Sequence, residues 1–151
     1  MNATRNRGFT LIELIVVITI LGILSAFAVP RFILLDGQAR AATIQGLAGS
    51  VRGAAALARG LSMSTGNLVS VTMEGSAVAL VNNYPNSTLG GIAAALNISP
   101  GDFTFTAGPT PATGPATWTK TGAPTPATCV VNYTPAAINT TPTINIVTTG
   151  C

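Results

Sequence analysis

Apolar residues are distributed unevenly along the chain, and the densest run lies near the start. From Phe9 to Val29 the only charged residue is Glu13. A helix rises 1.5 Å per residue, so about 20 residues span the roughly 30 Å of bilayer hydrocarbon. The run is therefore long enough for a transmembrane helix, and its one acid lies close to its beginning.

The pattern changes after Pro30 from uniformly apolar to amphipathic. We expect one helix from about Thr10 to about Leu61, apolar all round in its first half and apolar on one stripe in its second. The second half should cover a sheet. Pro30 lacks an N–H and clashes with the preceding turn, and Gly22 weakens its own turn, so we expect a kink at these positions. The stripe consists of Ile44, Leu47, Val51, Ala54, Ala58 and Leu61.

Beyond the helix the apolar residues alternate over short stretches, which is typical of strands. One side of the first strand is expected to carry Val69, Val71 and Met73. The order of one long helix followed by antiparallel strands predicts an α+β fold. Strands are expected at 68–73, 77–81, 103–105, around Trp118, and as a final hairpin of 129–133 with 143–148, with a short helix near 89–96 and loops at 82–85 and 107–128.

The composition excludes several classes of function. Hydrophobic residues make up 48% of the chain and charged residues 7%, with a net charge of +3 and no histidine. Histidine-based triads, bases and metal sites are thereby excluded. Only Glu74 and Asp102 carry acid beyond Leu61, too few for a typical calcium site. We expect no enzyme, no metal, no cofactor and no specific nucleic-acid partner.

The N-terminal flank gives an orientation. Arg5 and Arg7 precede the apolar run without an acid, so the flank should stay cytoplasmic and the rest of the chain should lie outside. A secretory signal peptide is the alternative, because Ala26-Phe27-Ala28 matches an A-x-A cleavage pattern and would release a soluble secreted binding module. The length of the run and Glu13 count against it, since an acid at mid-bilayer costs about 2.5–3.5 kcal/mol. The two cysteines, Cys129 and Cys151, form an even pair in an exported chain, which predicts a disulfide.

The junction Arg7-Gly8-Phe9-Thr10-Leu11-Ile12-Glu13 resembles the class III leader of type IV prepilins, with their N-terminal methylation motif. The resemblance implies the type IV pilin fold, with a leader at 1–8, a transmembrane and filament-core helix half at 9–29, and a globular domain at 30–151 closed by a C-terminal disulfide loop. It implies cleavage between Gly8 and Phe9 and methylation of the new Phe9 amine. It also implies pairing of Glu13 with a neighbouring subunit during assembly.

Shorter segments resemble the mannose-sensitive haemagglutinin pilins within that family. They are Pro30-Arg31-Phe32, Gln38-Ala39-Arg40, Thr43-Ile44-Gln45-Gly46-Leu47 and Thr149-Gly150-Cys151. This resemblance implies a structural subunit of a surface fibre used for adhesion.

The pilin resemblance also implies partners and locations. The partners would be further copies of the chain, prepilin peptidase, an inner-membrane platform with its ATPase, and an outer-membrane secretin. The precursor would lie in the inner membrane with its C-terminal domain in the periplasm, and the assembled fibre would be extracellular. A minor pilin or a type II secretion pseudopilin is the alternative, although major pseudopilins typically carry a calcium loop and lack the terminal disulfide.

Two further features have structural explanations that we favour. Gly49 and Gly53 form a GxxxG motif, which we expect to pack the helix closely on its own sheet rather than on another subunit. Trp118 is expected to be a core anchor rather than a receptor contact.

Overall fold

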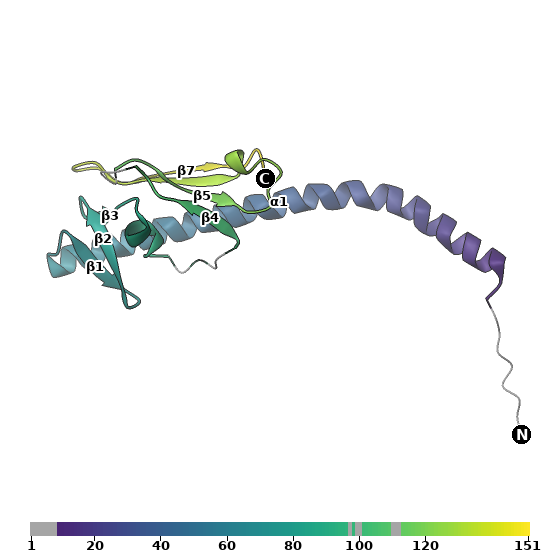
Figure 1. Cartoon of the computed structure of the whole chain (residues 1–151), viewed down its shortest axis with the longest axis horizontal. Helices are drawn as coiled ribbons and strands as arrows, with labels where there is room; N and C mark the ends of the chain where they lie inside the picture. The colour runs from purple at the N-terminus through teal and green to yellow at the C-terminus, as the bar shows by residue number, and fades with distance from the viewer. Residues whose placement is uncertain (1–8, 97, 99–100, 110–112) are drawn as a thin grey trace, which may run out of the picture. The chain divides into compact units, whose positions relative to one another are not determined.

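A computed structural model of the chain describes residues 9–96, 98, 101–109 and 113–151 (Figure 1). The chain divides into two compact units, Met1–Asp36 and Gly37–Cys151. The elements in order are α1 (Leu11–Thr65), β1 (Ser70–Met73), β2 (Ser76–Val81), β3 (Tyr84–Pro85), the single-turn helix η1 (Leu89–Ala93), β4 (Phe103–Thr106), β5 (Ala116–Lys120), the 3-10 turn η2 (Pro126–Thr128), β6 (Val130–Thr134) and β7 (Thr143–Val147).

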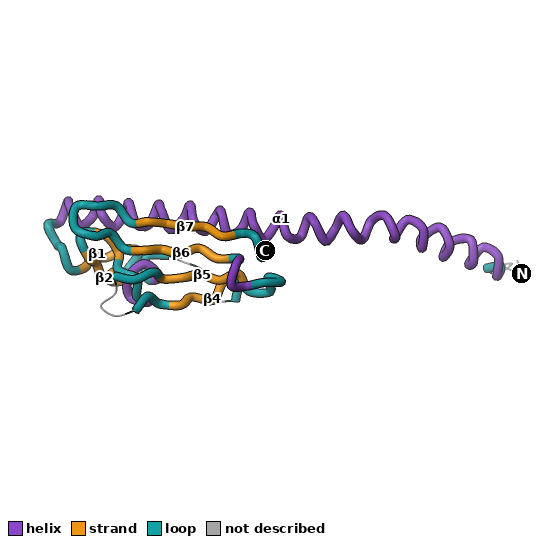
Figure 2. Tube along the Cα trace, turned by 90° about the horizontal axis from the view of Figure 1, so that it is seen from above, coloured by secondary structure: helices purple, strands orange, loops and turns teal. Residues whose placement is uncertain are grey.

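The strands form two antiparallel sheets rather than the single sheet expected. The first has the order β1-β2-β3 and the second the order β4-β5-β6-β7. Strands of the second sheet run alongside the C-terminal half of α1 (Figure 2). The α+β class, the long helix, the final β6–β7 hairpin and the C-terminal disulfide are as predicted from the sequence.

The long helix ends four residues later than expected. Gly66 has φ +67°, the left-handed conformation that commonly follows a helix C-terminus and that glycine adopts without strain. The hydroxyl of Thr65 donates to the carbonyl of Leu61, at 2.7 Å, within the last turn.

The start of β1 depends on the side chain of Asn67, which binds the backbone just before the strand. The Asn67 side-chain oxygen accepts from the backbone N–H groups of Val69 and Ser70, at 3.0 and 3.2 Å, so β1 begins only at Ser70. Val69 therefore lies outside the strand and is exposed, which corrects the predicted alternation. Val71 and Met73 are buried as expected.

The short strand β3 was expected to be loop. It pairs with β2 through a two-residue turn at Asn82 and Asn83, both with positive φ. Asparagine tolerates this conformation better than most residues, and a turn of this kind matches the twist of a hairpin. The Asn-Asn pair was the signal for the extra strand.

The C-terminal half of α1 presents one buried stripe to the sheets. The core around this stripe includes Trp118 and Tyr133, which are 2% and 0% exposed. Trp118 lies 5.0 Å from the ring of Phe105 and is a core anchor, as predicted. The buried helix residues among those described are Ile44, Leu47, Ala48, Val51, Ala55, Ala58 and Ser62.

The expectation that Gly49 and Gly53 pack on the sheet of their own subunit is wrong. Both glycines are exposed, and a Cβ added at either would meet nothing within 4 Å. Their positions lie on the side of α1 away from Val51 and Ala55, which occupy the sheet-facing stripe.

Candidate functional site

The first described turn of the chain holds the residues that the sequence singled out for assembly. Phe9 is 80% exposed and precedes α1, while Glu13 lies in the first turn of the helix. Gly8 and the rest of the predicted leader, 1–8, lie outside the described residues. The structure therefore places Phe9 and Glu13 within one helical turn of each other.

Thr10 and Glu13 form a capping box at the start of α1. One Glu13 carboxylate oxygen, Oε2, accepts from the Thr10 backbone N–H at 2.8 Å and from the Thr10 hydroxyl at 2.6 Å. The Thr10 hydroxyl oxygen in turn accepts from the Glu13 backbone N–H at 3.4 Å. These bonds satisfy N–H groups that a helix N-terminus leaves without partners.

The capping role of Thr10 was missed in the sequence. The Thr-x-x-Glu spacing ahead of an apolar run is its known signal. The cap fixes the side chain of Glu13 beside the helix N-terminus, where the helix dipole also favours an anion.

A hollow of about 350 Å³ lies next to the capping box. Glu13 is the only ionisable side chain among the described residues that line it, and the others are aromatic or aliphatic: Phe9, Ile12, Val16 and Val17. A carboxylate in such surroundings can bind a cation that enters the hollow. A hydrophobic cover over it would raise the cost of leaving the carboxylate without a partner.

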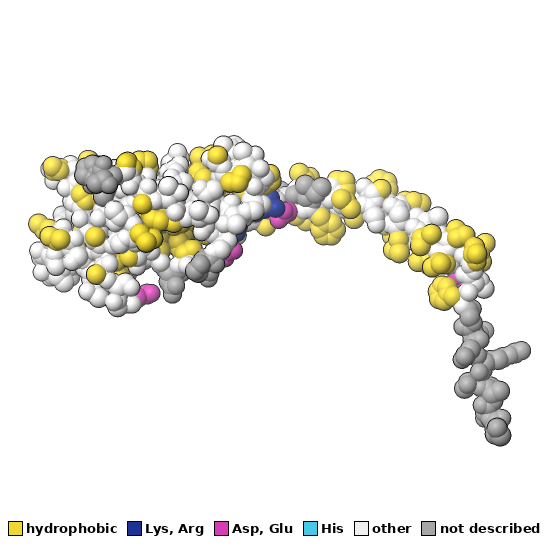
Figure 3. Space-filling model, viewed as in Figure 1, with side chains coloured by type: hydrophobic (Ala, Val, Ile, Leu, Met, Phe, Trp, Pro, Cys, Tyr) yellow, Lys and Arg dark blue, Asp and Glu magenta, His cyan; other side chains and the backbone are white. Residues whose placement is uncertain are grey.

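Apolar side chains are exposed through the first part of α1, from Leu11 to Phe32. The helix is long and apolar enough to cross a membrane, and its most apolar stretch is not buried. A signal sequence meets the same criteria of length and composition. Figure 3 shows hydrophobic side chains along this part of the helix.

The two residues predicted to kink the helix both lie inside α1. The helix α1 is continuous across both Gly22 and Pro30. A Cβ added at Gly22 would meet nothing within 4 Å. The kink stays a prediction.

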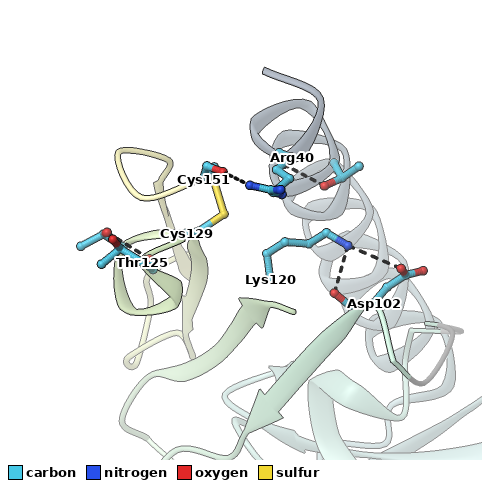
Figure 4. Close-up of a disulfide and its surroundings, with 8 residues drawn as sticks. Arg40, Asp102, Lys120, Thr125, Cys129 and Cys151 are labelled. Atoms are coloured by element: carbon cyan, nitrogen blue, oxygen red, sulfur yellow. Dashed lines mark hydrogen bonds and ion pairs between the residues drawn. A yellow bond between two sulfur atoms is a disulfide. The ribbon is translucent and has the colours of Figure 1, made fainter. Parts of the chain in front are cut away.

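The predicted disulfide joins Cys129 to Cys151 and closes a loop at the C-terminal end of the second sheet (Figure 4). Cys129 is fully buried. The Arg40 guanidinium donates to the backbone carbonyl of Cys151 at 2.9 Å, which ties the loop to α1. On the other side of the loop, the Thr125 N–H donates to the Gly150 carbonyl at 3.1 Å, and the Gly150 N–H donates to the Thr128 carbonyl at 3.0 Å.

No group of three or more histidine, cysteine, aspartate or glutamate side chains that could hold a metal occurs within the part of the chain that the structure describes. In the surroundings of the disulfide, Lys120 and Asp102 form an ion pair at 3.4 Å (Figure 4), and the Lys120 ammonium also lies over the ring of Phe103.

Comparisons with known proteins agree with the reading of the N-terminus. Residues 3–29 match the family described as Prokaryotic N-terminal methylation motif. The chain is 56% identical over 54 residues to the type IV narrow pilus major component PilA5 of Thermus thermophilus, covering 36% of this chain and 47% of that protein. It is 56% identical over 36 residues to the type IV major pilin protein PilA of Myxococcus xanthus, covering 24% of this chain and 16% of that protein.

The resemblance to type IV pilins is thereby confirmed for the N-terminal part of the chain. The matches span less than half the length of these curated relatives. No solved structure matches the chain significantly. The narrower resemblance to mannose-sensitive haemagglutinin pilins is not confirmed by these relatives and stays a prediction.

Proposed function

We propose that the protein is a structural subunit of a bacterial type IV pilus and polymerises through the N-terminal half of α1. The observation that carries the proposal is the position of Glu13, which a capping box holds at the start of a helix whose N-terminal half exposes its apolar side chains. The similarity of this segment to major pilins of two bacteria supports it.

Maturation would begin in the inner membrane. The leader, residues 1–8, stays in the cytoplasm because of Arg5 and Arg7, and the domain from residue 30 onward lies in the periplasm. A prepilin peptidase cuts between Gly8 and Phe9, and the new amine of Phe9 is methylated. The disulfide is compatible with the periplasm, where such bonds persist.

Assembly would move the apolar helix half out of the bilayer and into the centre of a fibre. Exposed side chains such as Leu11, Ile18 and Phe27 need a cover once they leave the lipid. Neighbouring copies of the same helix supply it. An inner-membrane platform with its ATPase would drive the step, and the fibre would leave the cell through a secretin.

The pairing of charges would set the register of the subunits. Cleavage gives Phe9 a cationic amine, and a neighbour's Glu13 faces a hollow that can receive it. A charge left without its partner in an apolar core costs several kcal/mol, so a wrong register is penalised more strongly than a correct one is rewarded.

Mass spectrometry of sheared and purified surface fibres tests the proposal. The expected result is a mature chain that begins at a methylated Phe9 and is the main component of the fibre. A mature chain that begins at Val29 and is found in the medium would instead indicate a soluble secreted module. Electron microscopy of cells with and without the gene shows whether the chain is a major subunit, since deletion of a major subunit removes the fibres.

Adhesion is the use that we propose for the fibre. The support is the similarity of the segments at 30–32, 38–40, 43–47 and 149–151 to adhesive pilins. Attachment of fibre-bearing and fibre-free cells to solid surfaces tests it separately from assembly. Equal attachment of both strains would overturn adhesion while leaving the structural role intact.

A further inference from the structure

Charge in the unit Gly37–Cys151 is not balanced locally. The unit has four basic side chains and two acidic ones. Lys120 and Asp102 pair with each other, and Arg40 binds the carbonyl of Cys151. Arg52, Arg59 and Glu74 remain without an ion-pair partner among the described residues.

These unpaired charges lie on different flanks of α1. Arg52, Arg59 and Met63 follow one another at helical spacing on one flank. Ala54, Leu57 and Leu61 lie about half a turn away on the opposite flank, given 3.6 residues per turn. The sheet-facing stripe and the exposed glycines occupy the two sides between these flanks.

The flank with Arg52 and Arg59 is basic and hollowed. Two hollows of about 430 and 660 Å³ adjoin at Arg59, Tyr84 and Thr141. No acidic side chain is among the described residues that line either of them. The Arg59 guanidinium lies 4.9 Å from the centre of the Tyr84 ring and donates one hydrogen bond to the Tyr84 hydroxyl, so it keeps further N–H donors for a ligand. We name this flank the basic flank.

The opposite flank carries the unpaired acid. Glu74 is exposed at the turn between β1 and β2, where it and Gly75 both have positive φ. The turn fixes the backbone at Glu74 beside a groove of about 500 Å³ that also contains Leu57 and Leu61. We name this surface the acidic flank.

Both flanks combine charge with exposed apolar surface. Met63 is 68% exposed and Ile138 76% exposed at the basic flank, and Leu57 is 57% exposed at the acidic flank. A basic flank and an acidic flank on opposite sides of one molecule, each with some exposed apolar surface, are complementary and allow contact between successive copies of the chain.

We propose that the acidic flank of one subunit docks on the basic flank of the next, with Glu74 of one copy facing Arg52 and Arg59 of its neighbour. The two flanks are different surfaces, so the contact is heterologous and repeats without closing unless the rotation forms a ring. The proposal rests on the proposed function, because it assumes that copies assemble into a fibre. It concerns the globular domains and is separate from the pairing of Glu13 with the Phe9 amine.

Charge reversal in the full-length chain tests the contact. Glu74→Lys and Arg52→Glu each place like charges across the docked flanks, so each variant alone should give at least about five-fold fewer fibres than the wild type, a change that corresponds to about 1 kcal/mol. Arg52 is preferred to Arg59 here, because changing Arg59 would also remove the bond to Tyr84. Glu74→Lys combined with Arg52→Glu in one chain should restore the fibres.

Co-expression of the two single variants distinguishes contacts between subunits from contacts within one. A fibre that contains both Glu74→Lys and Arg52→Glu chains can place opposite charges at the docked flanks, so the mixture should form fibres with both chains present in comparable amounts. Rescue in the combined chain without rescue in the mixture would overturn the proposal. Normal assembly of both single variants would also overturn it.

Asp102→Lys is the matched control. It reverses an acid of the same unit that is already paired with Lys120 in its own chain. Any defect of Asp102→Lys should not be corrected by Arg52→Glu, and correction would show a non-specific charge effect that contradicts the proposal. The wild-type strain distinguishes failure of this contact from failure of the proposed function. If wild-type cells make no fibres containing this chain, the proposed function itself is wrong.

Discussion

The Tyr133 hydroxyl donates a hydrogen bond to the Pro85 carbonyl at 2.7 Å and links the two sheets. Tyr133 belongs to β6 and is fully buried, and Pro85 belongs to the short strand β3. A second link runs from the Asn82 amide to the carbonyl of Ala136 at 2.8 Å. In the described part of the chain no strand of one sheet pairs with a strand of the other, so these side chains supply polar contacts between the sheets.

Replacing Tyr133 with phenylalanine should destabilise the globular domain. The change keeps the ring but leaves the buried carbonyl of Pro85 without its donor, which costs about 1–3 kcal/mol. Thermal unfolding of the purified full-length subunit in detergent, followed by circular dichroism, measures the loss. Thr104→Val on the exposed side of β4 is the control and should change little; an unchanged melting temperature for Tyr133→Phe would contradict the importance of the link.

Alkaline pH should weaken the fold through the same residue. Burial, with a smaller contribution from Tyr84, raises the pKa of Tyr133 above its ordinary value. The folded state therefore keeps a proton that the unfolded state releases above about pH 10, so stability is unaffected below that pH and falls as pH rises above it. Urea unfolding at neutral and alkaline pH should show a steeper fall for the wild type than for Tyr133→Phe. Parallel curves would show that Tyr133 is not responsible.

The contribution of the Glu13 charge to assembly can be separated from its role in the capping box. Glu13→Gln keeps a side chain that can complete the capping box but removes the charge, whereas Thr10→Val removes the cap but keeps the charge. If pairing with a neighbour's amine is the main role, Glu13→Gln and Glu13→Val should reduce fibre yield at least about ten-fold, because a buried unpaired charge costs about 3–5 kcal/mol. Cleavage after Gly8 should continue. Normal fibres made of Glu13→Gln alone would favour a purely capping role.

Gly8 should be required for maturation. A peptidase that binds an extended junction is expected to need a residue without Cβ there. Replacing Gly8 with a bulky residue should leave full-length precursor in the membrane, detectable by its mass and by its slower migration in gels. Phe9→Leu keeps an apolar residue after the cut and serves as the milder comparison. Complete processing of a Gly8→Trp chain would refute the predicted class of leader.

Loss of the disulfide should destabilise the domain by about 3 kcal/mol, since the two cysteines are separated by 22 residues. Cys151→Ser and the double change Cys129→Ala with Cys151→Ser should unfold at similar, lower temperatures. Fibre yield should fall with both. A domain of wild-type stability without the bond would show that the remaining contacts of the loop are sufficient.

The sequence predicted those features that depend on periodicity over many residues. The stripe from Ile44 to Ala58 indicated the buried face of α1, and the paired cysteines indicated the closed loop. Local chemistry accounts for the misses. The turn at Asn82 and Asn83 requires left-handed backbone, and the capping box at Thr10 depends on a reciprocal bond; both have short signals that periodicity does not detect.

The orientation of Gly49 and Gly53 was mispredicted for a different reason. A GxxxG motif indicates close approach of a neighbour but does not say which neighbour. The stripe of α1 that contains Val51 and Ala55 is the one that packs on the sheets. The two glycines therefore lie on the exposed side of the helix. A similar limit applies to Arg52, Arg59 and Glu74, because sequence spacing does not reveal that a β-turn and a helix place opposite charges on opposite flanks.

The contact between Arg40 and Cys151 has a mechanical consequence. Tension along a fibre built on α1 would enter the globular domain near Gly37, and three residues further on the guanidinium of Arg40 binds the carbonyl of Cys151. Cys151 is bonded covalently to Cys129, which directly precedes β6, and it follows β7 closely in the chain. Force applied at Cys151 therefore acts on the disulfide-closed loop that contains both β6 and β7. The hydrogen bonds between these strands must then break together rather than one at a time. Single-molecule extension of oxidised and reduced fibres would measure this as a lower rupture force after reduction.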